Sequence, residues 1–574
     1  NFYAGFKGGY SGSDDSKLGS VTLAGGNSIV SGMLMATQRE ASAQKTYGGD
    51  GGDGPKREAA DPQNINTDSL LFKLALSPAD AHKFGFTADL FKNETNTAIR
   101  SDYGTVSRGT LVNSRVADDE RERARYSLTY DYEGDLWFAD RVNLLGYHQN
   151  SETTQLTTEN RTPPIPGSLD QIRTRDSRFE QEINGVLLQA HKLLKADSMS
   201  HQLVIGIDYY ETNNESIRNG ATADVTGRSV REFSPLPTRD FPITEVQQFA
   251  LFLQDEIELL DGRLILSPGL RYDKFSADTN PDALYFGGNP GVTQPVDFED
   301  SALTGKLGAV YRLTDYASFY ANYSEGFRAP PYDDVNVGFT NFLGGYKTIS
   351  NANLESETSA GVELGFRLNA RVGSLNFALF KTDYENFIEE LAIAPGFLST
   401  GGVDPTDGLL TFQSVNLSNV VIQGAELSGE LDLSVMSTAL AGFNANAAIA
   451  YADGENATSS QPLDSVEPLT LVMGLGYDNV EGRWGGSVVW TVVDGKEQSD
   501  IDPSSIRKET SGYGTVDLLG YFRFGDNVTV NAGLFNVTDK EYVRWADTIA
   551  IDGDAVRRFT QPGFNAAINI RVEL

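Results

Sequence analysis

The sequence predicts an all-β fold: a 22-stranded antiparallel transmembrane β-barrel with short periplasmic turns and long extracellular loops. Three observations predict it. Apolar and polar side chains alternate with a period of two in about 22 segments, between residues 1–10 and 564–574. No run of about 18 apolar residues exists, so no transmembrane helix is expected. Short and long connections alternate along nearly the whole chain.

The alternation places apolar side chains on one face of each segment. One such set is Leu70, Phe72, Leu74 and Leu76, and the last is Phe564, Ala566, Ile568, Ile570, Val572 and Leu574. The mean hydropathy is −0.31, as expected if half of each strand faces a polar lumen. Residues 180–195 fit a helix, but they also fit one strand leading into a turn.

The connections fall into two classes that alternate. The short ones are expected at 24–27, 77–82, 259–262, 313–316, 369–373, 478–482 and 524–527. The long ones are expected at roughly 39–66, 93–121, 149–177, 212–245, 276–301, 327–356, 385–420, 494–511 and 538–563. An outer-membrane barrel keeps short turns on one side and long loops on the other, whereas a soluble sandwich has no reason to do so. An even strand number also lets the sheet close without unpaired edges.

Composition excludes several classes of function. The chain has 574 residues, a net charge of −33 and no cysteine, which rules out a disulfide framework and thiol catalysis. The acidic balance argues against nucleic acid as a partner. The sequence contains no G-x-S-x-G, H-E-x-x-H or P-loop motif, so we expect no enzyme and no intrinsic cofactor.

Two short motifs bracket the predicted loop at 327–356. Phe327, Arg328, Ala329 and Pro330 precede it, and Asn351, Ala352, Asn353 and Leu354 follow it, with Glu355 directly after. They resemble the FRAP and NPNL boxes of TonB-dependent receptors in the haemoglobin/transferrin/lactoferrin (haem-uptake) family, with Ala352 where proline is usual. Residues 254–273, 424–431 and 534–545 are also similar to that family. The resemblance covers essentially the whole chain.

The resemblance implies a multi-pass protein of the outer membrane of a Gram-negative bacterium, surrounded by lipid and lipopolysaccharide. It implies energy supplied by TonB–ExbB–ExbD and an N-terminal plug domain preceded by a TonB box. A strand pattern already begins at residue 1, so we expect residues 1–574 to be the β-barrel domain alone, without the plug and the TonB box.

The resemblance also implies haem, or haem from haem-proteins, as the transported ligand. Haem receptors of this kind carry a histidine between the two boxes, whereas residues 331–350 contain none. A receptor for a ferric siderophore or another nutrient is therefore an alternative. A passive porin or a surface adhesin barrel is a second one.

Candidate ligand residues are Tyr332 and Tyr346 in the bracketed loop, since tyrosinate can ligate ferric haem iron. Either can instead be one of the tyrosines that barrels place at membrane interfaces. His148 is expected near the outer end of its strand, beside the loop at 149–177. The other histidines, His82, His191 and His201, are expected at or near periplasmic turns.

The first box has a structural interpretation as well. Pro330 ends a strand because proline cannot donate to the ladder. Arg328 is then expected to pair with a wall carboxylate such as Glu355 or Glu357, so that the box shapes the base of the loop. Arg173, Arg175 and Lys347 are local basic residues that can offset the acidic charge toward an anionic ligand.

Overall fold

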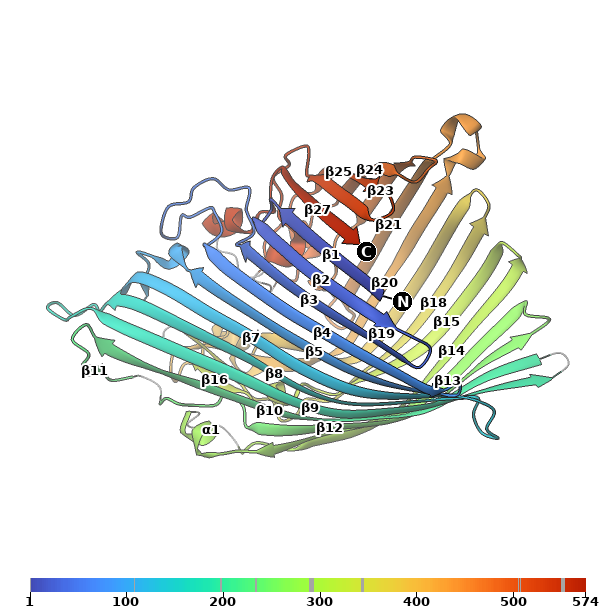
Figure 1. Cartoon of the computed structure of the whole chain (residues 1–574). Coiled ribbons are helices and arrows are strands. Elements are labelled where there is room, and N and C mark those ends of the chain that lie inside the picture. Colours follow the sequence, from blue (N-terminus) through green and yellow to red (C-terminus); the bar gives the residue numbers. More distant parts are fainter. Residues whose placement is uncertain are drawn as a thin grey trace.

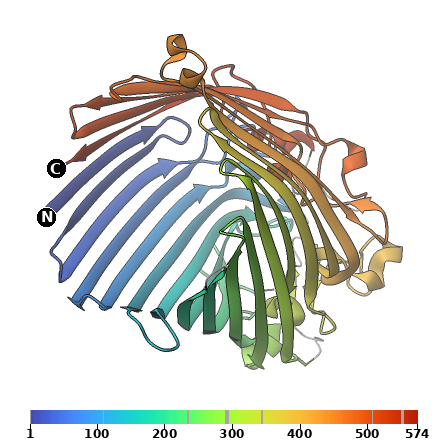
Figure 2. The same ribbon diagram turned by 90° about the vertical axis from the view of Figure 1, so that its right-hand side faces the viewer.

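The computed structural model is one closed antiparallel barrel of 22 long strands, in which the first strand pairs with the last (Figures 1 and 2). The structure describes residues 2–107, 109–196, 199–232, 235–288, 294–341, 345–503, 505, 507–548 and 553–574. The predicted fold class and strand number are confirmed.

The barrel strands follow one another around the wall in chain order. They are β1 (Phe2–Ser11), β2 (Ser16–Gly26), β3 (Val30–Ser42), β4 (Gln63–Ala79), β5 (His82–Ala98), β7 (Thr110–Glu133), β8 (Arg141–Thr162), β9 (Gln171–Ala196), β10 (Met199–Asp224), β12 (Ile243–Leu259), β13 (Leu264–Asn280), β14 (Phe298–Thr314), β15 (Ala317–Arg328), β18 (Glu357–Ala370), β19 (Gly373–Ile393), β20 (Leu410–Asp432), β21 (Phe443–Asn456), β23 (Thr470–Asp478), β24 (Trp484–Val493), β25 (Tyr513–Phe524), β26 (Val528–Phe535) and β27 (Asn565–Glu573).

The connections between the barrel strands contain short elements. They are the strands β6 (Val106–Ser107), β11 (Ser229–Val230), β16 (Gly338–Asn341), β17 (Tyr346–Ile349) and β22 (Gln461–Pro462), the helices α1 (Ala283–Gly288) and α2 (Tyr332–Asn336), and the 3-10 turns η1 (Arg100–Asp102), η2 (Pro395–Thr400), η3 (Leu433–Val435), η4 (Thr438–Leu440), η5 (Gln498–Asp500), η6 (Trp545–Thr548) and η7 (Gly553–Phe559). Among the described residues, no helix is long and apolar enough to cross a membrane.

The seam of the barrel lies between β1 and β27. Their register runs from Gly5 opposite Glu573 to Ser11 opposite Ala567. The Tyr3 hydroxyl donates to Glu573 Oε1 at 2.9 Å across this seam. Closure pairs the backbone groups that an open sheet would leave exposed at its edges, which a membrane interior requires.

Apolar side chains on the outer face form rows across neighbouring strands. Phe72 lies beside Phe86 with ring centroids 6.2 Å apart, and Phe84 lies 4.9 Å from Tyr130. Leu128 in the same band is 66% exposed in the isolated protein, which leaves it to be covered by lipid. The inner face is polar; the Asn531 amide, for example, donates to Asn569 Oδ1 at 2.9 Å.

Aromatic residues mark the periplasmic edge of the apolar band. Phe443, Tyr477 and Trp484 form a chain of ring contacts at 4.8 Å and 5.2 Å beside the β23–β24 turn. Such amphipathic rings prefer the level of the lipid headgroups. The contact row therefore marks where the wall leaves the membrane on that side.

The alternation of connection lengths is confirmed, with two departures. The first outer connection, 12–15, is short, and the periplasmic connection 433–442 carries η3 and η4. Several other periplasmic turns are tight. In the β12–β13 turn, for example, Leu260 and Asp261 have φ values of 54° and 56°, which suits the twist of a hairpin.

Four predicted outer loops are much longer than the observed connections. The connections observed for 93–121, 149–177, 212–245 and 385–420 run only over 99–109, 163–170, 225–242 and 394–409, because β7–β10, β19 and β20 are 21 to 26 residues long. A membrane needs only about 9–11 residues of each strand. Above the membrane both faces are polar, so the apolar alternation stops while the hydrogen-bonded ladder continues. Residues 180–195 belong to β9 and form a strand, not a helix.

The outer loops pack on one another above the barrel. The Tyr285 hydroxyl in α1 donates to the Asn336 carbonyl at 3.0 Å, and the Asn336 side chain exchanges two 2.9 Å hydrogen bonds with the Val296 backbone. The connection 281–297 therefore supports the bracketed loop, whose observed range is 329–356.

Candidate functional site

The first box lies where β15 ends at the mouth of the barrel. Phe327 and Arg328 are the last residues of that strand and pair with Thr358 and Glu357 of β18. Ala329 follows, and Pro330 is fully buried. The chain leaves the wall here because a proline has no N–H for the ladder.

Arg328 anchors the loop base through carboxylates, as its structural interpretation predicts. Its guanidinium lies 3.9 Å from Glu357 Oε2 and 3.4 Å from Glu390 Oε1 on β19. Glu355, the other expected partner, instead accepts a hydrogen bond from the Asn386 amide at 3.1 Å. Half of the Arg328 side chain is exposed, so this is a positioning contact of modest energy.

The second box is fastened to β20. The Asn351 amide donates to the Ser414 carbonyl at 2.9 Å, and its Oδ1 accepts from the Asn353 backbone at 3.1 Å. Leu354 is 3% exposed, and the Glu355 backbone N–H donates to Asn416 Oδ1 at 2.9 Å. Both boxes therefore hold the two ends of the 329–356 loop against the wall.

Tyr332 begins α2 and packs inside the loop assembly. Its ring meets Phe241 edge to face, with centroids 5.5 Å apart. Burial, with a further contribution from Asp333, raises the pKa of the Tyr332 phenol above its usual range. Its proposed role as an iron ligand stays a prediction, and the burial disfavours the tyrosinate form.

Tyr346 opens β17, the second strand of the small hairpin in the same loop. It is half-buried between Phe339 and Phe412, at 5.7 Å and 6.3 Å between centroids. The neighbouring Lys347 ammonium contacts Asp404 at 2.6 Å and Asp407 at 2.8 Å. Lys347 therefore brings no surplus positive charge to the site, while Tyr346 stays a candidate ligand.

His148 lies lower than expected. It is the eighth residue of β8, which continues to Thr162, so it is not at the outer end of its strand. It pairs with Tyr126, which is 43% exposed on the outer face, and its Nδ1 lies 2.9 Å from Asn184 Oδ1. Within the described residues, no group of three or more histidine or acidic side chains is placed to hold a metal ion.

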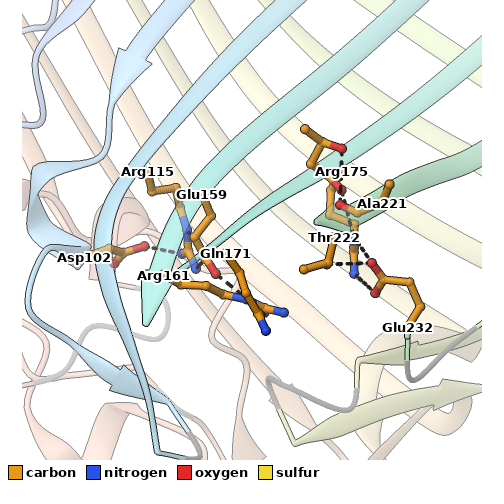
Figure 3. Close-up of polar contacts among 10 residues, drawn as sticks. Asp102, Arg115, Glu159, Arg161, Gln171, Arg175, Ala221, Thr222 and Glu232 are labelled. Carbon is orange, nitrogen blue, oxygen red and sulfur yellow. Dashed lines mark hydrogen bonds and ion pairs between the residues drawn. The ribbon is translucent and has the colours of Figure 1, made fainter. Parts of the chain in front are cut away.

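A cluster of arginines lies on the inner face of the wall, where β7–β10 extend above the membrane band. Figure 3 shows three of them, Arg115, Arg161 and Arg175, with their polar partners. Arg115, Glu159, Arg173 and Thr222 form one row across these four strands, because the register pairs them in turn. Arg115, Glu159, Arg173 and Arg175 line one side of a cavity of about 490 Å³, here called the arginine pocket. Arg161 lies beside this lining, next to Glu159.

Arg115 is neutralised within this cluster. Its Nε donates to Glu159 Oε2 at 3.0 Å, and its two terminal nitrogens donate to Glu159 and Asp102. Asp102 comes from η1 in the 99–109 connection, so this ion pair also ties that loop to the wall. Charge-assisted pairs of this kind fix an arginine in one orientation.

Arg175 is neutralised by a loop carboxylate. Its terminal nitrogens lie 2.5 Å and 3.4 Å from the two oxygens of Glu232, and the Thr222 hydroxyl donates to Glu232 Oε1 at 2.6 Å. Contact with Thr222 and Arg175 lowers the pKa of Glu232 against the opposing effect of burial. Glu232 therefore carries a negative charge at neutral pH.

Arg161 and Arg173 hold the unneutralised charge. Arg161 donates to Gln171 Oε1 at 3.1 Å and reaches Glu159 only at 3.8 Å. The buried Arg173 Nε has no hydrogen-bond partner, and no described carboxylate lies within ion-pair distance of Arg173. Burial, followed by repulsion from Arg175, lowers the pKa of Arg173 to about 10.

The arginine pocket adjoins the loop that carries the two boxes. Asn341, at the end of β16, contributes to the cavity lining. Nearby, Arg218 on β10 stacks over Phe339 of the same hairpin at 4.5 Å and pairs with Asp240 at 3.1 Å. The bracketed loop and the extended strands therefore meet at the arginine pocket.

The sequence revealed Arg173 and Arg175 but missed Arg115, Arg161, Glu159 and Asp102. The signal was present in the spacing, since 159, 161, 173 and 175 recur at intervals of two within polar runs. It was not recognised because these residues fell in segments predicted to be loops, where a period of two carries no facing information.

Comparison with known proteins agrees with the barrel fold. The family model described as "TonB dependent receptor-like, beta-barrel" matches residues 59–537. Hemoglobin-haptoglobin utilization protein B of Neisseria meningitidis is 22% identical over 646 residues, covering 98% of this chain and 77% of that protein. Hemoglobin-haptoglobin-binding protein A of Haemophilus influenzae is 27% identical over 49% of this chain, and the match spans only 28% of its length.

Solved structures share the fold at low identity. The copper transporter OprC superposes with a TM-score of 0.72 at 17% identity, over 100% of this chain and 80% of that one. The FrpB iron transporter from Neisseria meningitidis gives 0.70 at 13% identity, with 100% and 81% covered. The ferric citrate transporter FecA gives 0.68 at 16%, with 100% and 78% covered. The chain belongs to the TonB-dependent receptor-like β-barrel family, and it is a multi-pass protein of the Gram-negative outer membrane.

Proposed function

We propose that the protein captures haem, or haem from haem-proteins, and transports it across the outer membrane. The observation that carries this proposal is the fastening of the 329–356 loop by both boxes at the mouth of the barrel, beside a cationic pocket. Relatives that match the chain are named for binding haemoglobin or haemoglobin–haptoglobin, and another is named for haemoglobin–haptoglobin utilization, which supports a haem-bearing cargo.

Transport against a gradient requires an energy source, and the chain has no nucleotide-binding motif. We propose that TonB–ExbB–ExbD supplies it through a TonB box and a plug domain belonging to the full-length receptor. In three Haemophilus influenzae relatives, the stretch that matches this chain makes up only 28–29% of the relative's length, so most of each relative lies outside the match. Surrounding lipid and lipopolysaccharide are the remaining partners expected of this outer-membrane wall.

Haem titration of the purified protein in detergent tests the ligand. A saturable shift of the Soret band, together with growth of an expressing strain on haem as sole iron source, is the expected result. No shift in the wild type, with no growth on haem, would contradict the proposal.

The same titration assigns the iron ligand. Among the three candidates, we propose Tyr346, because Tyr332 is buried with a raised pKa and His148 lies on the outward-facing row. Y346A should change the Soret position, whereas Y332A and H148A should leave it unchanged. A change in Soret position with H148A alone would contradict the assignment of Tyr346 and identify His148 as the ligand.

A ferric siderophore or another nutrient is the second candidate cargo. The absence of histidine from residues 331–350 favours it, and one fold neighbour is titled a ferric citrate transporter. Quenching of intrinsic fluorescence by ferric chelates, without any response to haem, would establish this alternative.

A further inference from the structure

We propose that the arginine pocket is a carboxylate-binding subsite, in which Arg173 contacts the ligand from the pocket lining and the adjacent Arg161 reaches it from beside the cavity. The proposal rests on the proposed function, because it places one part of the cargo in the pocket beside the 329–356 loop. Haem carries two propionate carboxylates, and ferric chelates of citrate carry carboxylates as well. The shared chemistry is a carboxylate group, and the experiment separates the two sources.

The charge balance of the pocket supports an anionic ligand. Arg115, Arg173 and Arg175 line it together with Asp102 and Glu159. Arg161 and Glu232 lie directly beside this lining, as partners of Glu159 and Arg175, so that four arginines meet three carboxylates. Arg115 forms ion pairs with Asp102 and Glu159, and Arg175 forms an ion pair with Glu232, so these contacts balance most of the negative charge. One positive charge is left over, centred on Arg173 and shared with Arg161.

The surplus charge is held in an unfavourable state. A partly buried guanidinium with an unpartnered Nε loses hydration without gaining a hydrogen bond. The depressed pKa of Arg173 reports the same cost. A ligand carboxylate that enters the cavity would remove this penalty, so its binding energy would be concentrated at this residue.

The arrangement suits a planar carboxylate. Arg161 and Arg173 lie on the inner face of adjacent strands, with Arg173 opposite Glu159 and Arg161 opposite Gln171, which makes the two arginines diagonal neighbours. Guanidinium forks match the two oxygens of a carboxylate. The surplus of one charge favours a carboxylate over a phosphate dianion, which would meet repulsion from Glu159 and Glu232.

The neighbouring strand offers a matched control. Arg178 is five residues from Arg173 on β9 but has the opposite strand parity, so it faces outward. It pairs with Glu152 at 2.9 Å and Glu180 at 2.6 Å. R178A removes the same charge from the same strand without altering the pocket.

The test is equilibrium binding of three probes to the purified protein in detergent: haem, haem dimethyl ester and ferric citrate. We expect R173A and R161A each to weaken binding of the preferred carboxylate probe by about 10- to 100-fold, the usual effect of one charge-assisted hydrogen bond. R173K should recover only part of the loss, because it restores charge but not the fork. R178A should bind like the wild type.

The dimethyl ester and Glu232 supply readouts that a folding defect would not produce. Ester binding should be weaker than haem binding in the wild type and insensitive to R173A. E232Q should tighten carboxylate binding several-fold, because it frees Arg175 without altering the shape of the pocket.

The outcomes separate the two proposals. Haem binding that is unaffected by R173A, R161A and esterification overturns the subsite and leaves the haem function standing. Binding of ferric citrate but not haem, with sensitivity to R173A, supports the subsite and overturns the haem cargo. If the wild type binds none of the carboxylate probes, the subsite is overturned too.

Discussion

Asn351 is the residue at which the family motif and the wall meet most directly. Its side chain donates to the Ser414 carbonyl at 2.9 Å and accepts from the Asn353 N–H at 3.1 Å. The neighbouring Asn353 side chain is exposed. Two asparagines of one box therefore have different tasks, and only the first fastens the loop.

We predict that N351A loosens the 329–356 loop by about 1–3 kcal/mol, because it leaves backbone groups of Ser414 and Asn353 without partners. Limited proteolysis should cleave this loop faster, while the heat-modifiable mobility of the folded barrel on gels stays unchanged. N353A is the matched control and should digest like the wild type. Equal digestion of both variants would contradict an anchoring role.

Asp334 gives the loop a pH dependence. Burial, reinforced by Asp333 and Glu390 and opposed by Ser414 and Arg328, raises the pKa of Asp334 to about 6. A carboxyl whose pKa is higher in the folded loop binds protons more tightly there, so loop docking weakens as the pH rises from about 4 to about 6 and then levels off.

We expect proteolysis of the loop to be slower at pH 5 than at pH 7, by about 1 kcal/mol of docking free energy after solvent screening. D334N should digest slowly at both pH values, because the amide mimics the protonated form. A steeper loss of protection toward acid in the wild type would contradict the assignment.

Among the elements, strand β7 shows how one strand serves two environments. Its lower part alternates Leu128 outward with Thr129 inward, whereas its upper part carries Arg115 above the membrane. The same backbone ladder continues through both parts. Only the outward-facing side chains of the lower part contact lipid, so only those positions must be apolar.

L128R should destabilise the barrel by about 2–4 kcal/mol, since it places a charge on the lipid face near the middle of the apolar band. T129R puts the same side chain one residue away, toward the lumen, and should change stability little. Urea unfolding in lipid vesicles, followed by tryptophan fluorescence, measures both. Similar losses for the two variants would contradict the assignment of faces.

For the whole molecule, closure depends on the seam between β1 and β27. Asn569 pairs with Gly9 across the seam and with Asn531 on the other side. An interruption at this point would free backbone groups on two neighbouring strands, where lipid offers no replacement partner.

N569P should therefore cost about 3 kcal/mol or more and reduce the heat-modifiable, folded fraction on gels, because it breaks a central ladder. N569A removes only the lumen-facing hydrogen bond to Asn531 and should fold nearly as well as the wild type. Normal folding of N569P would mean that the seam does not limit assembly.

The sequence by itself determined the barrel: the strand number, the alternation of turn lengths and the outer-membrane setting. Those features follow from the period-two alternation of apolar side chains and from the number of residues needed to cross the membrane, both of which can be read within each segment. It also located the loop bracketed by Arg328 and Asn351. Near the mouth of the barrel, the predicted strands end too early, because both faces of β7–β10 are polar there and show no apolar alternation.

Only the tertiary structure decided the arginine pocket. Arg115, Glu159 and Arg173 are separated by 44 and 14 positions in the sequence, yet they form one cross-strand row. Strand register, set by the lengths of the turns and by long hydrogen-bonded ladders, brings them together. Which arginine lacks a partner then depends on loop carboxylates such as Asp102 and Glu232. No local pattern encodes their final positions, because packing of distant segments places them.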